Sequence, residues 1–152
     1  MKFEKEITVS VRPERVWAFL WDVDRVTRCL PGCKEARTIV PHERYEAVIG
    51  ERVGPFKVQF PLAIQVLEAR APRRLRAEAI GRDAAMGSAL RVTLDLLLEG
   101  QGAGSRLLIQ SDVGILGKLG TLGHGIIQQK ANGIMTQFAE SMRKELEAEG
   151  QA

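Results

Sequence analysis

The chain has 152 residues, 45% of them hydrophobic and 27% charged, and its 22 basic and 19 acidic residues give a formal net charge of +3. This composition is typical of one globular domain large enough to bury a core, and it argues against intrinsic disorder. The small, interspersed surplus of basic residues does not indicate a nucleic-acid-binding protein.

The sequence carries no signal for export or for a membrane span. The N-terminal segment MKFEKEITVSVRPE alternates charged and apolar residues and lacks the apolar core of a signal peptide. No run of about 18 apolar residues occurs, so no membrane-spanning helix is predicted. Two cysteines, Cys29 and Cys33, are too few for a disulfide framework. We therefore expect a cytoplasmic protein with reduced thiols.

The first part of the chain predicts one strand and two short helices. Residues 3–11 alternate apolar and polar side chains, which is typical of a half-buried strand. Pro13 suits the first turn of a short amphipathic helix. A second short helix follows, with Asp22 or Asp24 as its N-cap and an end before the break at residues 30–32.

Between Lys34 and Val113 the pattern changes to short strands separated by turns. Pro61 lies inside one of these runs and predicts a bulge or an edge position there. Links of hairpin length favour an antiparallel meander with one buried face. The six predicted strands cover residues 36–40, 45–53, 56–66, 75–79, 90–98 and 107–113.

From about Lys118 to Glu149 the apolar residues recur with a period of 3.6, which predicts one long helix with a wide apolar stripe. Such a helix needs a surface to cover, and the predicted sheet provides one. We therefore predict a single α+β domain over residues 1–152. Its order, one strand, two helices, six strands and one helix, is that of the helix-grip fold, a seven-stranded curved antiparallel sheet around a long C-terminal helix.

Four segments carry a resemblance that goes beyond the fold. They are, in chain order, VDRVTRCLPGC, VGPFKVQF, GRDAAMGSAL and DVGILGKLGTLG. Together they resemble the signature blocks of the carbon monoxide dehydrogenase G-subunit family, which belongs to the START-like, Bet v 1-like superfamily of hydrophobic-ligand-binding proteins. The resemblance extends from about Phe3 to Phe138.

The resemblance implies a role and a site. Members of the family are accessory to molybdenum-containing carbon monoxide dehydrogenase-type hydroxylases and are associated with recruiting the enzyme to the membrane and, by implication, with binding a quinone or similar lipid. We expect any membrane contact of this chain to be peripheral, on the inner face of the membrane. The implied cavity lies between the sheet and the long helix, with walls from Tyr45, Ile49, Phe60, Leu94, Leu119, Leu122, Ile126 and Phe138.

Two further residues belong to the predicted ligand-binding set, with alternatives left open. Trp17 either packs the helix on the sheet or forms part of the cavity wall. Glu51 is in phase with the apolar face of its strand, so a bulge or strand end turns it outward, or else it points inward. In the second case it and Tyr45 are the best candidates for fixing a polar head group.

The sequence predicts no metal, no cofactor and no assembled catalytic site. The cysteines in a C-x3-C spacing and two histidines, His42 and His124, do not provide ligand pairs at zinc-site spacing. No nucleophile, phosphate-loop or zincin motif occurs. The alternative is an enzyme like the polyketide cyclases and dehydratases of the superfamily, acting in the same cavity through His124, Glu51 or Asp112.

Glycines before the long helix also allow more than one interpretation, because several glycines together weaken a helix. They permit a close approach of helix and sheet, a late helix start, or a flexible gate formed by Gly117, Gly120 and Gly123 at the mouth of the cavity. A membrane contact is the remaining alternative, through Ile115, Leu116, Lys118, Leu119 and Leu122.

Four arginines gather at a predicted hairpin tip: Arg70, Arg73, Arg74 and Arg76. A solvated turn explains them most simply. Docking to a protein partner or to anionic lipid head groups is the alternative. Aromatic residues do not alternate with these arginines, which argues against nucleic acid as a partner.

Overall fold

The computed structural model describes residues 1–83, 85 and 87–151. Ala84 and Met86, in the third of the four family-like segments, lie outside the described residues. The described elements are, in chain order, β1 (Lys2–Val9), α1 (Pro13–Trp21), α2 (Val23–Cys29), β2 (Cys33–Val40), β3 (Arg44–Val53), β4 (Phe56–Arg70), β5 (Arg74–Asp83), β6 (Ser88–Gln101), β7 (Gly104–Leu116), the 3-10 helix η1 (Lys118–Leu122) and α3 (His124–Gln151).

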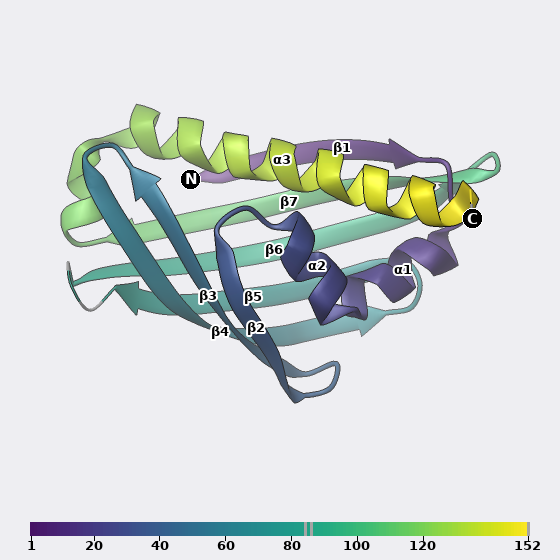
Figure 1. The fold of residues 1–152 in the computed structure, drawn as a ribbon, viewed down its shortest axis with the longest axis horizontal. Helices are drawn as coiled ribbons and strands as arrows, with labels where there is room; N and C mark the ends of the chain where they lie inside the picture. Colours follow the sequence, from purple (N-terminus) through teal and green to yellow (C-terminus); the bar gives the residue numbers. More distant parts are fainter. Residues whose placement is uncertain (84, 86, 152) are drawn as a thin grey trace.

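The seven strands form one antiparallel sheet in the order β1-β7-β6-β5-β4-β3-β2. Strands β2 to β7 are a meander of hairpins, and β1 pairs with β7 so that Ile7 lies opposite Leu107. The sheet curves, and α3 runs along its inner face from the η1 end to the end that carries α1 (Figure 1). This arrangement confirms the predicted helix-grip fold.

The helices α1 and α2 form as their sequences predict. Pro13 occupies the first turn of α1, where its missing N–H removes no hydrogen bond. Asp22 caps α2, its carboxylate accepting a hydrogen bond from the backbone N–H of Arg25 at 3.3 Å. The two helices fill the end of the sheet at which α3 ends (Figure 1).

The long helix begins later than about Lys118, as the late-start alternative for the glycines predicts. Strand β7 continues to Leu116, η1 follows, and α3 begins at His124. Gly117 and Gly123, at the two ends of η1, have φ angles of 93° and 96°. Side chains other than glycine rarely adopt this backbone conformation, so these two glycines interrupt the helix although the apolar period continues through them.

The sequence predicts a bulge or an edge position at Pro61, and the structure places this residue in a central strand, just outside the β4–β5 ladder. The strand lies inside the sheet, between β3 and β5, and its irregular pairing with β5 occurs between Val66 and Glu68. Pro61 is tolerated because it lies one position beyond Leu62, which pairs with Gly81 at the end of the β4–β5 ladder.

The buried residues form two clusters on the inner face of the sheet. The first joins α1, α2 and the C-terminal half of α3 to β1, β6 and β7, with Val16, Phe19 and Met142 fully buried. The second lies under η1, between the β3–β4 hairpin and the neighbouring strands, and Leu119 is at its centre with 2% exposure. The core is therefore divided into two packing centres along the sheet.

The attachment of α2 to α3 generates a pH-dependent prediction. Glu145 of α3 accepts hydrogen bonds from Arg25 and Arg28 of α2, both at 3.2 Å, and these bonds, first that of Arg25, lower the pKa of the Glu145 carboxyl below its ordinary value of 4.5. Because the pKa is lowered in the folded state, the ion pairs stabilise the fold at pH values above the ordinary pKa of 4.5. This stabilisation is lost as the pH falls through the folded-state pKa.

We expect Glu145→Gln to destabilise the protein by on the order of 0.5 kcal/mol near neutral pH, the range of partly exposed ion pairs. The difference from wild type should shrink as the pH is lowered to about 3, measured by urea unfolding. Glu140→Gln, which alters a more exposed pair with Arg143, serves as the control. An equal loss at both pH values would contradict this assignment.

Candidate functional site

A groove with a volume of about 460 Å³ opens between the end of β3 and the middle of α3. We call it the helix–strand groove. Its apolar walls come from Val53, Ile126 and Ile134, and the remainder is polar or glycine. The full lining is Glu51, Val53, Gly54, Ile126, Gln129, Lys130, Gly133, Ile134 and Gln137. It lies at the interface of sheet and long helix, where the sequence predicts a ligand.

The turn between β3 and β4 forms one end of this groove. Gly54 in the turn has a φ of 58°, and a Cβ atom at this position would lie 3.5 Å from Leu122 and 3.9 Å from Ile126. The ammonium group of Lys118 lies 5.5 Å from the centre of the Phe56 ring, a cation–π contact. These contacts hold η1 and the start of α3 against the hairpin.

One ion pair crosses the groove. The Glu51 carboxylate in β3 lies 2.7 Å from the Lys130 ammonium in α3, and the two side chains are 19% and 36% exposed. Glu51 therefore points toward α3, the inward one of the two orientations that its sequence position allows. Its partner Lys130 is not among the predicted site residues, although its spacing of four from both Ile126 and Ile134 places it on the inner stripe of the helix.

The predicted cavity walls divide between the two core clusters. Around the buried Phe60 and Leu119, the partly buried Ile49 and Leu122 belong to the cluster under η1. Trp17, Leu94 and Phe138 pack against the other cluster. Ile126 is 43% exposed and lines the groove. That these side chains contact a ligand stays a prediction.

Tyr45 does not join Glu51. Its hydroxyl accepts a hydrogen bond from the backbone N–H of His42 at 2.8 Å, at the turn between β2 and β3. The His42 ring stacks on Trp21 at 4.1 Å, so this turn is attached to α1. Tyr45 and Glu51 are six positions apart in β3, a distance of about 20 Å at about 3.3 Å per residue. The two residues therefore cannot hold one head group together.

The glycines of the predicted gate lie in and around η1. Gly117 begins the element, Gly120 is inside it and Gly123 ends it. Leu119 within η1 donates its backbone N–H to the Ser88 hydroxyl at 2.9 Å, and Ser88 is fully buried. One buried hydrogen bond and one buried side chain thus fix η1 to β6. Opening of this segment stays a prediction.

The residues named for the enzyme alternative lie apart. Glu51 is in the groove, His124 is exposed at the start of α3, and Asp112 is on the outer face of β7, where it binds the N-terminal amino group at 3.1 Å. Burial raises the pKa of the thiols of Cys29 and Cys33. Within the described residues, no group of three His, Cys, Asp or Glu side chains is placed to hold a metal ion.

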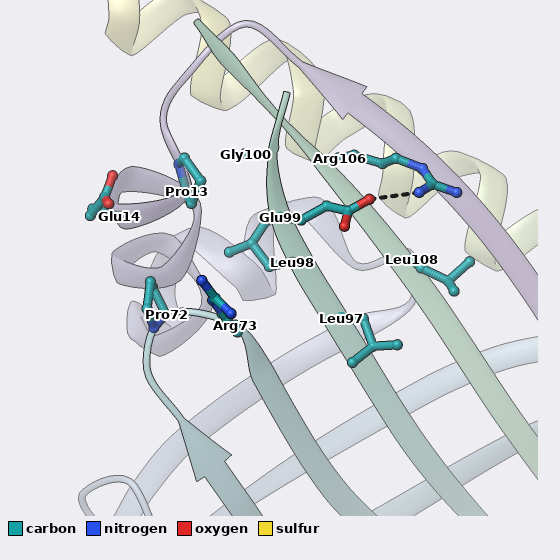
Figure 2. A pocket seen from close by; sticks show the side chains of 10 residues that line it. All are labelled: Pro13, Glu14, Pro72, Arg73, Leu97, Leu98, Glu99, Gly100, Arg106 and Leu108. Carbon is teal, nitrogen blue, oxygen red and sulfur yellow. Dashed lines mark hydrogen bonds and ion pairs between the residues drawn. The ribbon is translucent and has the colours of Figure 1, made fainter. Parts of the chain in front are cut away.

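A larger hollow, about 820 Å³, lies on the outer face of the sheet beside the start of α1 (Figure 2). Leu97 and Leu108, neighbours across β6 and β7, form its apolar part. Arg73 and an Arg106–Glu99 ion pair of 2.6 Å form its charged part. Its described lining includes no residue of the predicted ligand-binding set, so we assign the candidate site to the helix–strand groove.

The arginines at the β4–β5 turn are largely paired with carboxylates. Arg70 pairs with Glu68 at 2.6 Å, and Arg74 and Arg76 both pair with Asp95, at 3.1 and 3.6 Å. This arrangement favours a solvated, ion-paired turn over a free basic patch. None of the helices in the described part of the chain combines the length and the hydropathy of a membrane span.

The curved sheet and the long helix that covers it form the START-like, Bet v 1-like helix-grip fold. The sequence identifies the family: residues 6–147 match the family profile of the carbon monoxide dehydrogenase G-subunit (CoxG). The chain therefore belongs to the CoxG family, as its four sequence segments predict. No curated protein sequence matches it.

Solved structures agree with this fold. A conserved protein from Geobacillus kaustophilus is similar with a TM-score of 0.83 and 19% identity, covering 97% of this chain and 96% of its own. A START superfamily protein from Mycobacterium smegmatis has a TM-score of 0.71 and 10% identity over 97% of both chains. The Zhui aromatase/cyclase from Streptomyces sp. R1128 has a TM-score of 0.73 and 12% identity, covering 97% of this chain and 93% of its own. At such identities these likenesses show the fold alone.

Proposed function

We propose that this protein binds a hydrophobic ligand, quinone-like or lipid-like, between its sheet and α3, and that it catalyses no reaction itself. The observation that carries this proposal is the helix–strand groove, in which three apolar side chains lie beside one partly buried ion pair and two glutamines. Small-molecule sites combine apolar surface with a few polar groups that fix the orientation of the ligand. Membership of the CoxG family supports the same conclusion.

We further propose an accessory role toward a molybdenum carbon monoxide dehydrogenase-type enzyme. The family description supports this association. The similar fold of an aromatase/cyclase keeps catalysis as the alternative. Against it, the three acid–base candidates of this chain, Glu51, Asp112 and His124, occupy separate positions, whereas general acid–base catalysis needs such groups within reach of one substrate.

The end of the molecule that carries η1 supports a peripheral contact with an anionic membrane. Leu116 is 74% exposed there, while Leu119 is buried. The adjoining segments 52–57, 80–90 and 116–126 contain four basic residues and one carboxylate, which belongs to the buried Asp83. The four basic residues are Arg52, Lys57, Arg82 and Lys118. Each basic group near an anionic surface contributes about 1 kcal/mol.

Filling the groove tests the binding site. Gly133 lines the groove from α3, and a Cβ atom there meets nothing within 4 Å, so the backbone leaves room for the Cβ atom of Gly133→Leu. We expect this variant to bind decylubiquinone at least about tenfold more weakly than wild type, measured by isothermal titration calorimetry, because the leucine occupies ligand space.

Gly125→Leu is the matched control, since Gly125 also lies in α3, also has free space, and is outside the groove lining. Both leucines should keep or raise thermal stability, because leucine favours a helix by nearly 1 kcal/mol over glycine. If the two variants bind decylubiquinone with equal affinity, the ligand does not bind in the groove. Absence of binding to wild type would contradict a quinone-like ligand.

A second experiment tests the membrane contact. We expect the protein to sediment with vesicles of phosphatidylglycerol and phosphatidylcholine in equal parts, less so as salt is added. Leu116→Gln should weaken binding about tenfold, the factor equal to about 1.4 kcal/mol and close to the value of burying one leucine. Leu97→Gln, at an exposed leucine near the other end of the sheet, should have no effect. Similar losses in both variants would argue against this surface.

A further inference from the structure

We propose that the Glu51–Lys130 pair selects the head group of the ligand: it accepts amphiphiles whose head is uncharged and carries oxygen, and it rejects those with a carboxylate head. This inference rests on the proposed function. It adds the chemical class of the ligand and assigns its selection to two residues that face each other across the groove.

The position of Glu51 is built into the fold. Its second carboxylate oxygen packs against the backbone of Gly32, where a Cβ atom would lie only 2.8 Å from that oxygen. Gly32 has a φ of 78°, so glycine suits both the turn and the carboxylate beside it. On the opposite side, Glu51 contacts Lys130 at 2.7 Å. The carboxylate is thus held between the start of β2 and the middle of α3.

The surroundings of the pair are those of a binding site. Val53, Ile126 and Ile134 line the same groove, so an alkyl or isoprenoid chain has apolar surface next to the charged groups. A partly buried ion pair is weak evidence of a stabilising role, because desolvation offsets much of the attraction between the charges. A role in selecting the ligand explains why the Glu51–Lys130 pair lies beside apolar residues better than a role in stabilising the fold does.

The remaining hydrogen-bonding capacity of the pair defines what fits. An ammonium group has three donors, and Glu51 engages one side of Lys130, so Lys130 can still donate to a carbonyl or hydroxyl oxygen. Glu51, as a carboxylate, can accept from a hydroxyl group. A carbonyl-bearing or hydroxyl-bearing head therefore finds a partner on either residue without breaking the pair.

An anionic head group meets a different situation. The charged residues of the groove lining are Glu51 and Lys130, and their charges cancel, so the lining gives a carboxylate no net attraction and Glu51 repels it at close range. Another lysine near this strand, Lys34, does not change this balance inside the groove. Its side chain lies over Gly50, whose position in β3 faces the outer side of the sheet.

The test compares 1-decanol with decanoate, which share one alkyl chain and differ in head-group charge, by isothermal titration calorimetry at about pH 7.5, where the acid is ionised. We expect wild type to bind 1-decanol at least about tenfold more tightly. Glu51→Gln keeps the shape of the side chain and leaves Lys130 unneutralised, so it should reduce this ratio at least about tenfold by strengthening decanoate binding.

Two further variants complete the design. Lys130→Gln should weaken decanoate further and leave 1-decanol within about threefold, since an amide still donates to a hydroxyl oxygen. Glu46→Gln, in the same strand and paired with Arg37 outside the groove, should leave the ratio unchanged. Thermal unfolding shows that each variant is folded.

The outcomes separate the two proposals. Equal binding of both probes to wild type, or an unchanged ratio in Glu51→Gln, would overturn head-group selection while ligand binding stands. If wild type binds neither probe, the proposed function fails and the selection proposal fails with it.

Discussion

The stripe of α3 side chains that packs on the inner face of the sheet is the contact on which the rest of the structure depends. Ala139, Met142 and Leu146 are at most 2% exposed. Fully burying a large apolar side chain contributes about 1.5–3 kcal/mol. The sheet is antiparallel with one apolar face, and α3 is long enough to run along that face (Figure 1). The height at which α3 lies above the strands therefore sets the space available to a ligand.

This contact is uneven along the helix. The C-terminal half contributes three residues that are almost completely buried, whereas in the N-terminal half Ile127 is buried and Ile126 is 43% exposed. Lys130 interrupts the apolar stripe between these regions. The helix–strand groove lies where the packing of α3 is weakest, and η1, held by Ser88, lies next to it. A well-packed half beside a less buried half agrees with the low local stability that binding segments require.

Local patterns explain what the sequence alone predicts. The strands alternate with period two and the long helix with period 3.6, so both can be identified from neighbouring residues, as can Pro13 in the first turn of α1 and Asp22 as the cap of α2. The start of α3 is predicted too early because apolar residues continue in helical spacing through Gly117 and Gly123, and only their φ angles separate η1 from the helix. The Glu51–Lys130 pair depends on how far the β3–β4 hairpin curls toward α3, which no local pattern encodes.

The proposed ligand binding connects these features. CoxG family membership supports it, the groove is its proposed place, and the ion pair in the groove is its proposed head-group selector. The end of β7, where Leu116 is exposed, lies at the same end of the molecule as η1 and the β3–β4 turn (Figure 1). Under the proposed function, a ligand would pass between a membrane and the groove at this end without crossing the well-packed half of the core.

Organic extraction of the purified native protein, followed by mass spectrometry, tests this account most directly. It predicts an apolar molecule in stoichiometric amount, with a head group that is uncharged and carries oxygen. An empty extract, together with no change in melting temperature when quinones are added, would contradict ligand binding.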